Sequence, residues 1–219
     1  MPTRIEIDKF PGNIEVNLGV LTANVVVQKT DTLLKKEIHK LTNHIMTDYG
    51  LKDIHDIKTI RDSRLFYKNI GQDPSRYRVS SEALYRRIVT GKGLYFINNV
   101  VEINNIISLK SGFSVGCYDL DKIEGPVVFR IGNRNEQYKG IGKDVFSVQK
   151  LPVFSDSKGA FGSPTSDSMR TMITQQTRNI MLVIISFSGQ DKINHFLHEA
   201  KTHFTKWAQG SNFNENIQA

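Results

Sequence analysis

Four clusters of polar residues stand where a sequence that only builds a core has no need of them. They are the stretches 73–88, 100–109, 125–142 and 156–177. The first places four arginines around a predicted helix start, and the last is dense in hydroxyl side chains. Buried amides and carboxylates cost free energy unless they are hydrogen-bonded or bind a ligand. Helix caps and turn networks explain some of these residues, and the others are candidates for binding or catalysis.

The sequence lacks the standard motifs of a phosphate, nucleophile or metal site. The stretches 90–93 and 140–143 contain glycine and lysine but not the spacing with which a P-loop holds phosphate. The stretch 159–163 is no nucleophile elbow, which needs a glycine two residues before and two after the serine. His195 and His198 lie on the polar side of the last predicted helix, with no third metal ligand beside them. We therefore expect no metal site and no cofactor.

Composition indicates a soluble protein of a reducing compartment. Hydrophobic residues make up 39% of the chain and charged residues 23%, so a core can form. The single cysteine, Cys117, excludes an intramolecular disulfide framework and a cysteine-built zinc site. The first ten residues lack the apolar stretch of a signal peptide, and no segment approaches about 18 uninterrupted apolar residues. We expect a cytoplasmic protein without a membrane span.

Positive charge is concentrated in one part of the chain. The net charge is +7, and the stretch 61–92 has eight basic and three acidic residues, which accounts for +5 of it. Such an excess favours a polyanionic partner such as RNA. A solvated basic face that keeps the protein in solution is the simpler alternative, so the cluster alone does not decide between them.

Periodicity of apolar residues predicts the elements that must position these clusters. Alternation indicates a strand within 13–28, and helical spacing predicts helices over 31–49, 54–70 and 98–110. A further helix follows Ser80 and closes at Gly91.

The second half of the chain is richer in strands. Stretches 115–120, 126–131 and 146–154 are short strands between polar turns, and 180–187 is an apolar run typical of a strand buried on both faces. Ser188 and Asp191 form a capping-box pattern before a last helix. The apolar stripe of this helix consists of Ile193, Phe196, Leu197, Ala200, Phe204 and Trp207.

Helices early, strands late and a closing helix predict an α+β fold with a mixed β-sheet core and packed helices. No linker or internal repeat divides the chain, so we expect a single domain. In it, residues 1–60 form N-terminal strands and a helix, residues 61–187 the core, and residues 188–209 a packing helix. The polar residues 210–219 are expected to form a loose tail.

The four clusters, in this order, resemble the B3/B4 domain of the phenylalanyl-tRNA synthetase β subunit, and more closely its free-standing relatives. The resemblance covers about residues 61–187, well over half of the chain. Its most specific parts are DPSRYRVSSEALYRR at 73–87 and VVEINNIISLKSGFSVGCYDLDKI at 100–123. The closing pattern consists of Asp167, Ser168, Arg170, Thr171 and Thr177.

This resemblance implies an editing domain. In the synthetase, the module hydrolyses the ester of tyrosine wrongly attached to phenylalanine tRNA, because a hydrophobic pocket discriminates poorly against an isostere with an added hydroxyl. A free-standing copy would act in trans as an aminoacyl-tRNA deacylase, on a mischarged or non-protein aminoacyl-tRNA. Its partner would be the aminoacylated 3′ end of a tRNA.

The resemblance also assigns positions. Asn104 and Asn105 match the Thr-Asn pair that lines the family's editing pocket. Asp119 matches the aspartate that ends a glycine-to-aspartate segment, and Glu136 matches an acidic residue of an Arg-x-Ala-x-x-Gly-Glu-like stretch.

At two positions the chain departs from the synthetase pattern. Gly116 stands where the synthetase has a histidine, and Val183 stands where it has a pocket glutamate on the last strand. Both departures remove groups that would recognise the synthetase's own misacylated amino acid. They argue against tyrosine as the substrate and against hydrolysis by the same arrangement of side chains.

Hydrolysis of an aminoacyl ester asks little of a site. The ester is already activated, so a site has to hold the carbonyl, stabilise the oxyanion and position one water, and the terminal ribose hydroxyl of the tRNA could assist. The candidates for these catalytic roles are Asn104, Glu136, Ser163 and Asp167. The candidates for substrate binding are Asn105, Asp119, Arg130, Asp156, Arg170 and Thr177. The candidates for salt-dependent contacts with tRNA phosphates are Arg76, Arg78, Arg86 and Arg87.

Two rival functions stay open. The chain could be a non-catalytic RNA-binding module derived from the synthetase domain, or it could bind a free amino acid or a similar metabolite. Salt-dependent tRNA binding separates the first two functions from the third, and turnover separates the deacylase from the RNA-binding module. Each arginine also has a structural alternative, an ion pair with Asp73, Glu82 or Glu136. The chain is too short for a synthetase catalytic core and has no ATP-binding motif.

Overall fold

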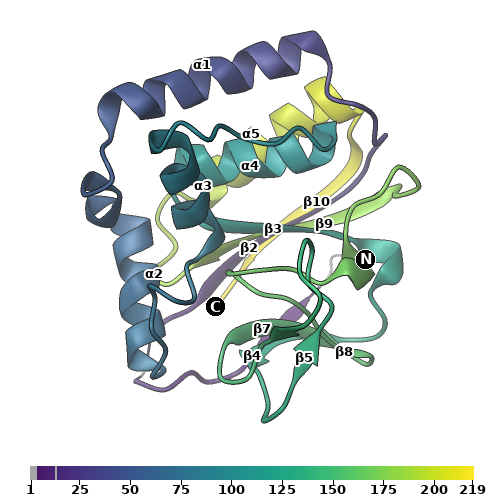
Figure 1. Ribbon diagram of the computed structural model, residues 1–219. Coiled ribbons are helices and arrows are strands. Elements are labelled where there is room, and N and C mark those ends of the chain that lie inside the picture. Colours follow the sequence, from purple (N-terminus) through teal and green to yellow (C-terminus); the bar gives the residue numbers. More distant parts are fainter. Residues whose placement is uncertain (1–3, 13) are drawn as a thin grey trace.

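Three layers stack in this protein, as Figure 1 shows. Helices cover one face of a four-stranded sheet, and a second four-stranded sheet packs against its other face. The computed structural model describes residues 4–12 and 14–219. Asn13, with which the first predicted strand began, lies outside the described residues.

The central sheet has the strand order β10-β2-β9-β3, and all its neighbouring strands are antiparallel. Its members are β2 (Asn17–Asn24), β3 (Ser114–Asp119), β9 (Asn179–Ser186) and β10 (Ser211–Gln218). Along β9 successive residues alternate between the faces, so that Leu182 meets the helices and Val183 meets the second sheet. This confirms the prediction of a strand buried on both faces.

The helical layer is held by apolar stripes of the predicted spacing. It consists of α1 (Thr32–Asp48), α3 (Ser80–Val89), α4 (Asn99–Ser111) and α5 (Ile193–Ala208). The whole predicted stripe of α5 is buried in the core between the helices and the central sheet. A single turn of 3-10 helix, η1 (Asp53–Asp56), precedes α2 (Lys58–Asn69), which runs down one side of the molecule.

The second sheet has the order β1-β4-β7-β8 and is mixed, because β1 and β4 run parallel. Its strands are β1 (Ile5–Ile7), β4 (Val127–Ile131), β7 (Pro152–Asp156) and β8 (Gly159–Gly162). A two-stranded ribbon of β5 (Gln137–Tyr138) and β6 (Phe146–Ser147) and two 3-10 turns, η2 (Leu120–Lys122) and η3 (Met169–Thr171), complete the structure. The architecture confirms the predicted α+β fold.

The prediction of a loose tail is wrong. Residues 211–218 form β10, which pairs antiparallel with the edge of β2. Phe213 and Ile217 lie partly buried against the helical core. Hydropathy does not indicate this strand, because most of its residues are polar. It is held by backbone hydrogen bonds to the edge of β2, which would otherwise be unpaired.

Two smaller expectations also fail. The predicted strand over 146–154 is divided, because a turn closed by the Leu151 N–H donating to the Val148 carbonyl (2.9 Å) separates β6 from β7. Ser188 and Asp191 do not cap α5. The helix instead begins after Lys192, which has a left-handed backbone (φ 67°) and makes no side-chain cap.

Among the described residues, no helix is both long enough and apolar enough to span a lipid bilayer.

Candidate functional site

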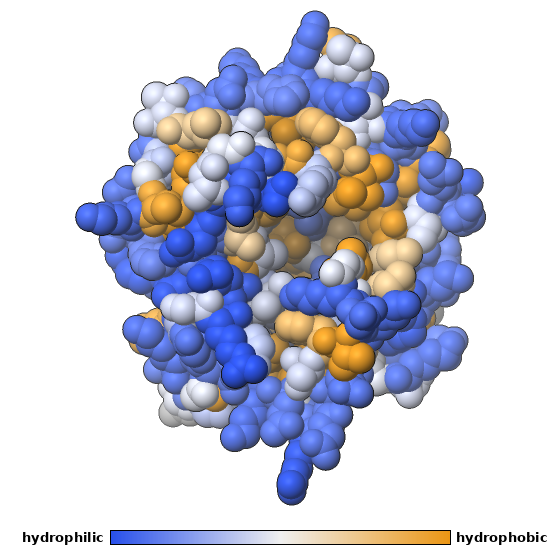
Figure 2. Space-filling view, in the orientation of Figure 1, coloured by the Kyte–Doolittle hydropathy of each residue, from blue (hydrophilic) through white to orange (hydrophobic). Residues whose placement is uncertain are grey.

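A cavity of about 510 Å³ lies between the helical layer and the loops of the second sheet, at the edge strand β3. In the view of Figure 2 this side of the molecule is hollowed, and hydrophobic residues gather around the hollow. Its polar lining residues are Ser80, Arg87, Asn104, Asn105, Ser108, Cys117, Thr165, Ser166 and Asp167. Its apolar lining residues are Ala83, Leu84, Ile97, Val101, Val115, Ile141, Met172 and Ile173. The volume suits a small ligand, for which cavities of about 300–1,000 Å³ are usual.

Helix α4 presents two of the candidate residues, Asn104 and Asn105, to this cavity. The helix is capped by Asn98, whose side chain accepts from the Val101 N–H at 3.0 Å. The apolar face of α4 is buried in the core, and the two consecutive asparagines lie beside that face, where they line the cavity. The Oδ1 of Asn104 is buried and accepts no hydrogen bond from the described residues. Such an oxygen can accept from a ligand N–H.

Asp167 supplies a carboxylate to the same cavity. Its Oδ1 accepts from the Tyr118 hydroxyl at 2.9 Å and from the Ser163 N–H at 3.2 Å. Burial raises the pKa of Asp167 to about 6, while the two hydrogen bonds act in the opposite direction. At neutral pH the carboxylate is therefore mostly ionised, and it is more basic than an ordinary aspartate. A group of this kind can take a proton from a bound water.

Tyr118 reaches Asp167 by passing between two glycines. A Cβ atom built on Gly116 would come within 2.3 Å of the Tyr118 hydroxyl, and one built on Gly162 within 2.4 Å. Any larger residue at either position would displace the tyrosine. The Tyr118 ring therefore fills the space that a histidine side chain at position 116 would need. The second departure, Val183, is the register partner of Gly116 and faces the same buried side of the sheet.

Ser163 is engaged in its own turn. Its hydroxyl donates to the Ser166 carbonyl at 2.8 Å and accepts from the N–H groups of Ser166 (3.0 Å) and Thr165 (3.3 Å). The Ser163 side chain does not line the cavity, but its turn places Thr165, Ser166 and Asp167 there. The structure therefore gives Ser163 a part in shaping the site.

Glu136 and Arg130 form a two-pronged ion pair away from this cavity. The guanidinium donates from Nη2 to Oε1 at 2.7 Å and from Nη1 to Oε2 at 2.9 Å, and the Asn133 N–H donates to Oε2 at 2.7 Å. The hydrogen bond from Arg130 holds the pKa of Glu136 below its ordinary value, against the effect of burial. Glu136 lines a separate surface depression beside β5 and Arg170. Its carboxylate is already satisfied there.

The remaining candidates for substrate binding are also paired within the protein. Asp156 accepts from both Nη atoms of Arg170 at 2.9 Å, and burial is outweighed by hydrogen bonds that lower the pKa of its carboxyl. The Thr177 hydroxyl donates to Asp119 Oδ2 at 2.7 Å. These pairs tie η3 to β7 and the 174–177 turn to the end of β3. They hold the loops that close the cavity and do not line it.

Two of the candidate arginines point toward Glu82, a fully buried carboxylate of α3. Arg86 Nε donates to Glu82 at 2.8 Å, and Arg78 lies at 3.8 Å. Arg64, outside the candidate set, also binds this carboxylate at 2.9 Å, and these contacts lower the pKa of Glu82 despite its burial. Arg86 therefore forms the ion pair that was the structural alternative to RNA binding, and Arg78 forms a longer ion pair with the same carboxylate.

Arg76 and Arg87 make no such pair among the described residues. The guanidinium of Arg76 lies 5.2 Å from the Tyr77 ring centre. Arg87 lines the cavity, and its guanidinium lies 3.9 Å from the ring centre of Tyr95. Of the four arginines, Arg87 alone lines the cavity within the part of the chain that the structure describes.

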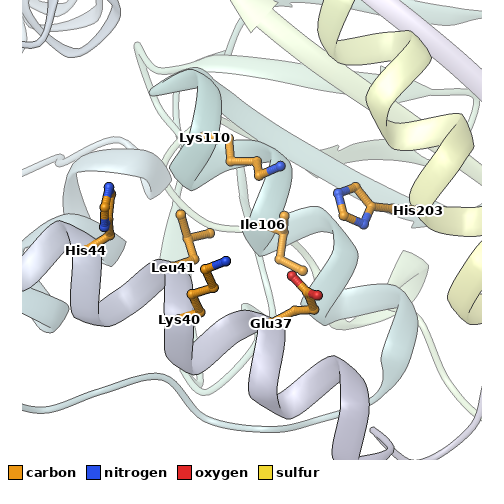
Figure 3. A pocket seen from close by; sticks show the side chains of 7 residues that line it. All are labelled: Glu37, Lys40, Leu41, His44, Ile106, Lys110 and His203. Atoms are coloured by element: carbon orange, nitrogen blue, oxygen red, sulfur yellow. The ribbon is translucent and has the colours of Figure 1, made fainter.

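A second, smaller cavity of about 270 Å³ lies between α1, α4 and α5 (Figure 3). It is lined by Glu37, Lys40, Leu41, His44, Ile106, Lys110 and His203, none of which was a candidate. The described residues contain no group of three or more His, Cys, Asp or Glu placed to hold a metal ion.

Sequence reasoning did not single out Tyr118 or the exposed residues 95–97. The tyrosine reads as one more apolar residue of a strand, and only its fold-back over Gly116 shows its link to Asp167. The segment could have been noticed in the sequence, because four apolar residues, Leu94 to Ile97, follow Gly93 in a stretch too short to form a strand or helix before Asn98.

The chain matches the family model described as the B3/4 domain over residues 62–216. It is 28% identical over 148 residues to the phenylalanine–tRNA ligase β subunit of Bifidobacterium longum, covering 64% of this chain and 17% of that protein. With the β subunit of Streptococcus mutans it shares 21% identity over 207 residues, covering 91% and 26% of the two chains. The chain thus spans about a quarter or less of these relatives.

Among solved structures, an N-terminal fragment of the phenylalanyl-tRNA synthetase β subunit from Pyrococcus horikoshii matches with a TM-score of 0.47 and 11% identity. The match covers 99% of this chain and 56% of the fragment. The family match extends beyond the resemblance noted in the sequence, because it includes α5 and most of β10.

Proposed function

The chain belongs to the B3/4 domain family, and from this premise we propose that it is an aminoacyl-tRNA deacylase, which hydrolyses the ester between an amino acid and the 3′ end of a tRNA. The observation that carries the proposal is the placing of Asp167 and Asn104 in one cavity beside Arg87. These three groups match the parts of an aminoacyl-tRNA. A general base can activate the water that attacks the ester, an unsatisfied acceptor can bind the α-ammonium, and a cation can bind the negatively charged tRNA backbone. The relatives named above are subunits of a tRNA ligase, which supports tRNA as the partner.

In the proposed reaction Asp167 activates the water. Its Oδ1 is held by Tyr118 and Ser163, which leaves Oδ2 to accept a proton from a water in the cavity. The water oxygen attacks the ester carbonyl carbon, and the bond from that carbon to the ribose oxygen breaks. The proton passes to the ribose oxygen, so the products are the free amino acid and the tRNA. General base catalysis of this kind contributes about 10²–10⁴-fold in rate.

The asparagines hold the substrate in this scheme. Asn104 Oδ1 is a buried acceptor without a partner among the described residues, and it suits the α-ammonium of the amino acid. The side-chain N–H groups of Asn104 and Asn105 can donate to the ester carbonyl as negative charge develops on it. Among the described residues that line the cavity, Asp167 is the one carboxylate, so we assign it the role for which the sequence offered both Glu136 and Asp167.

The apolar lining favours an amino acid with an apolar side chain. Leu84, Val101, Val115 and Ile173 supply this surface, and the recess beside Gly116 is filled by Tyr118. A tyrosine hydroxyl that entered this lining would lose its hydrogen bonds to water, which is costly unless it finds a partner. We therefore infer that an apolar amino acid, rather than tyrosine, is removed.

The test is to incubate the protein with a panel of correctly and wrongly charged tRNAs and to follow the loss of ester against buffer alone. Asp167→Asn and Asn104→Ala should slow the reaction by about 10²-fold or more and about 10-fold, respectively. Met46→Ala, an exposed residue of α1, is the control that should leave the rate unchanged. Glu136→Gln tests whether Asp167 or Glu136 is the general base. If Asp167 is the base, this variant should leave the chemical step intact.

Selective turnover of one charged species, lost in Asp167→Asn, would support the proposal. If every charged tRNA decays as fast in buffer as with the protein, while tRNA still binds, the chain is a non-catalytic RNA-binding module.

A further inference from the structure

Three consecutive apolar residues lie exposed between α3 and α4. Tyr95, Phe96 and Ile97 expose 69%, 36% and 62% of their surface. A run of this kind on a protein surface is unfavourable unless it has a function. Phe96 has partners on α1, where the His39 ring packs edge-on at 5.7 Å and the Lys35 ammonium lies 5.4 Å from the ring centre. Tyr95 and Ile97 are more exposed than Phe96.

The Tyr95 ring is backed by an arginine on one face only. The Arg87 guanidinium lies 3.9 Å from the ring centre, the distance of direct stacking, and its Nη2 donates to the Lys92 carbonyl at 3.3 Å. Since most of the Tyr95 surface is exposed, its other face is open to solvent. An aromatic ring supported by a planar cation is thus displayed in a defined orientation.

The segment that carries this ring is anchored at its far end. The Ile97 N–H donates to Glu102 Oε1 at 2.7 Å, and Glu102 is buried, with its Oε2 accepting from the Thr30 hydroxyl. The next residue, Asn98, caps α4. The backbone hydrogen bond from Ile97 to a buried carboxylate and the helix cap at Asn98 fix the end of the segment that joins α4.

The displayed ring stands at the mouth of the candidate cavity. Arg87, on which it stacks, and Ile97, two residues further along, both line that cavity. A second cation lies close by, because Lys92 is exposed and its carbonyl accepts the hydrogen bond from Arg87. An open aromatic face stacked on a guanidinium, with an exposed lysine beside it, suits a nucleic acid better than an apolar protein surface.

We propose that Tyr95, backed by Arg87, is a stacking platform for the terminal nucleobase of the tRNA. This inference rests on the proposed function, which places the aminoacyl ester in the cavity. With the aminoacyl group beside Asp167, the ribose lies at the mouth, and the base attached to it reaches the platform outside. Stacking tolerates any base, because every base has a π face, and the arginine behind the ring adds a favourable electrostatic contact.

The first experiment measures binding without chemistry. An uncharged tRNA that carries 2-aminopurine in place of its terminal adenine loses fluorescence when that base stacks. The wild-type protein, Tyr95→Phe and the control Met46→Ala should all quench the probe. Tyr95→Ala should abolish the quenching and weaken tRNA binding about 5- to 150-fold, the range for loss of one base–aromatic stack. Quenching and affinity that survive in Tyr95→Ala overturn the platform and make the segment a surface for a protein partner.

The second experiment separates the platform from the catalytic proposal. On charged tRNA, Tyr95→Ala should lower kcat/KM by the same factor, while its hydrolysis of a simple alkyl ester of the same amino acid stays at the wild-type rate. A loss on both substrates would place the defect inside the cavity and overturn the platform. If the wild type hydrolyses neither substrate but still quenches the probe, the proposed function fails and the platform stands.

Discussion

Replacing Asp167 by asparagine should stabilise the folded protein at neutral pH while it removes the proposed activity. Burial raises the pKa of this carboxyl from 3.8 to about 6. Between these two values the folded protein binds a proton that the unfolded chain releases, so stability falls as the pH rises through the window. A shift of about 2 units corresponds to a loss of at most about 3 kcal/mol above pH 6.

An asparagine at this position carries no charge to bury and still accepts the hydrogen bond from Tyr118. We therefore expect Asp167→Asn to match the wild type in stability near pH 4 and to exceed it by up to about 3 kcal/mol at pH 7. For a chain of this length that difference raises the Tm by up to about 6–12 °C. The measurement is urea and thermal unfolding of both proteins at five pH values between 4 and 8.

Glu136→Gln is the matched control for the sign of the effect. The pKa of Glu136 is held low by Arg130, so its contribution to stability is present above the ordinary pKa of glutamate and is lost as the pH falls through the lowered value. Glu136→Gln should accordingly be less stable than the wild type at pH 7, and the deficit should shrink in acid. A wild type as stable as Asp167→Asn at pH 7, or a difference that does not change between pH 4 and 7, would refute the assigned pKa.

Three further outcomes test the rest of the structure. Glu82→Gln removes a buried charge that binds several cations and should destabilise the protein by about 3 kcal/mol in urea unfolding; an unchanged midpoint would show that the cluster is not structural. Tyr118→Phe removes a hydrogen bond that lowers the pKa of Asp167, so the acid limb of the pH–rate profile for deacylation should move to higher pH, and an unmoved limb would remove Asp167 as the base. Deleting residues 211–218 exposes the edge of β2 and should lower the Tm by several degrees and promote association in light scattering; a monomer of unchanged Tm would contradict the role given to β10.

Local pattern was enough to predict most elements of the fold. The stripe of α5 and the apolar run of β9 depend on which face each residue turns to the core, and that periodicity is written along the chain. The polar clusters at 100–109 and 156–177 led to Asn104 and Asp167, because a buried amide or carboxylate needs a partner or a ligand. The structure brings these two residues into one cavity.

Pairing through space could not be predicted in the same way. Glu136, a catalytic candidate, and Asp156, a substrate-binding candidate, are acidic residues of the same polar clusters that led to Asp167. Only the folded chain shows that Arg130 and Arg170 already bind them. The same holds for β10, whose polar residues carry little pattern and whose hydrogen bonds come from a strand almost 200 residues earlier in the chain.

The sequence by itself thus determined the fold class, the family resemblance and the set of polar candidate residues. Tertiary structure alone decided which of those residues share a cavity and which neutralise one another. The physical reason is that burial periodicity is a property of neighbouring residues along one element. The pKa of Asp167 and the stacking of Tyr95 on Arg87 instead arise where separate segments meet.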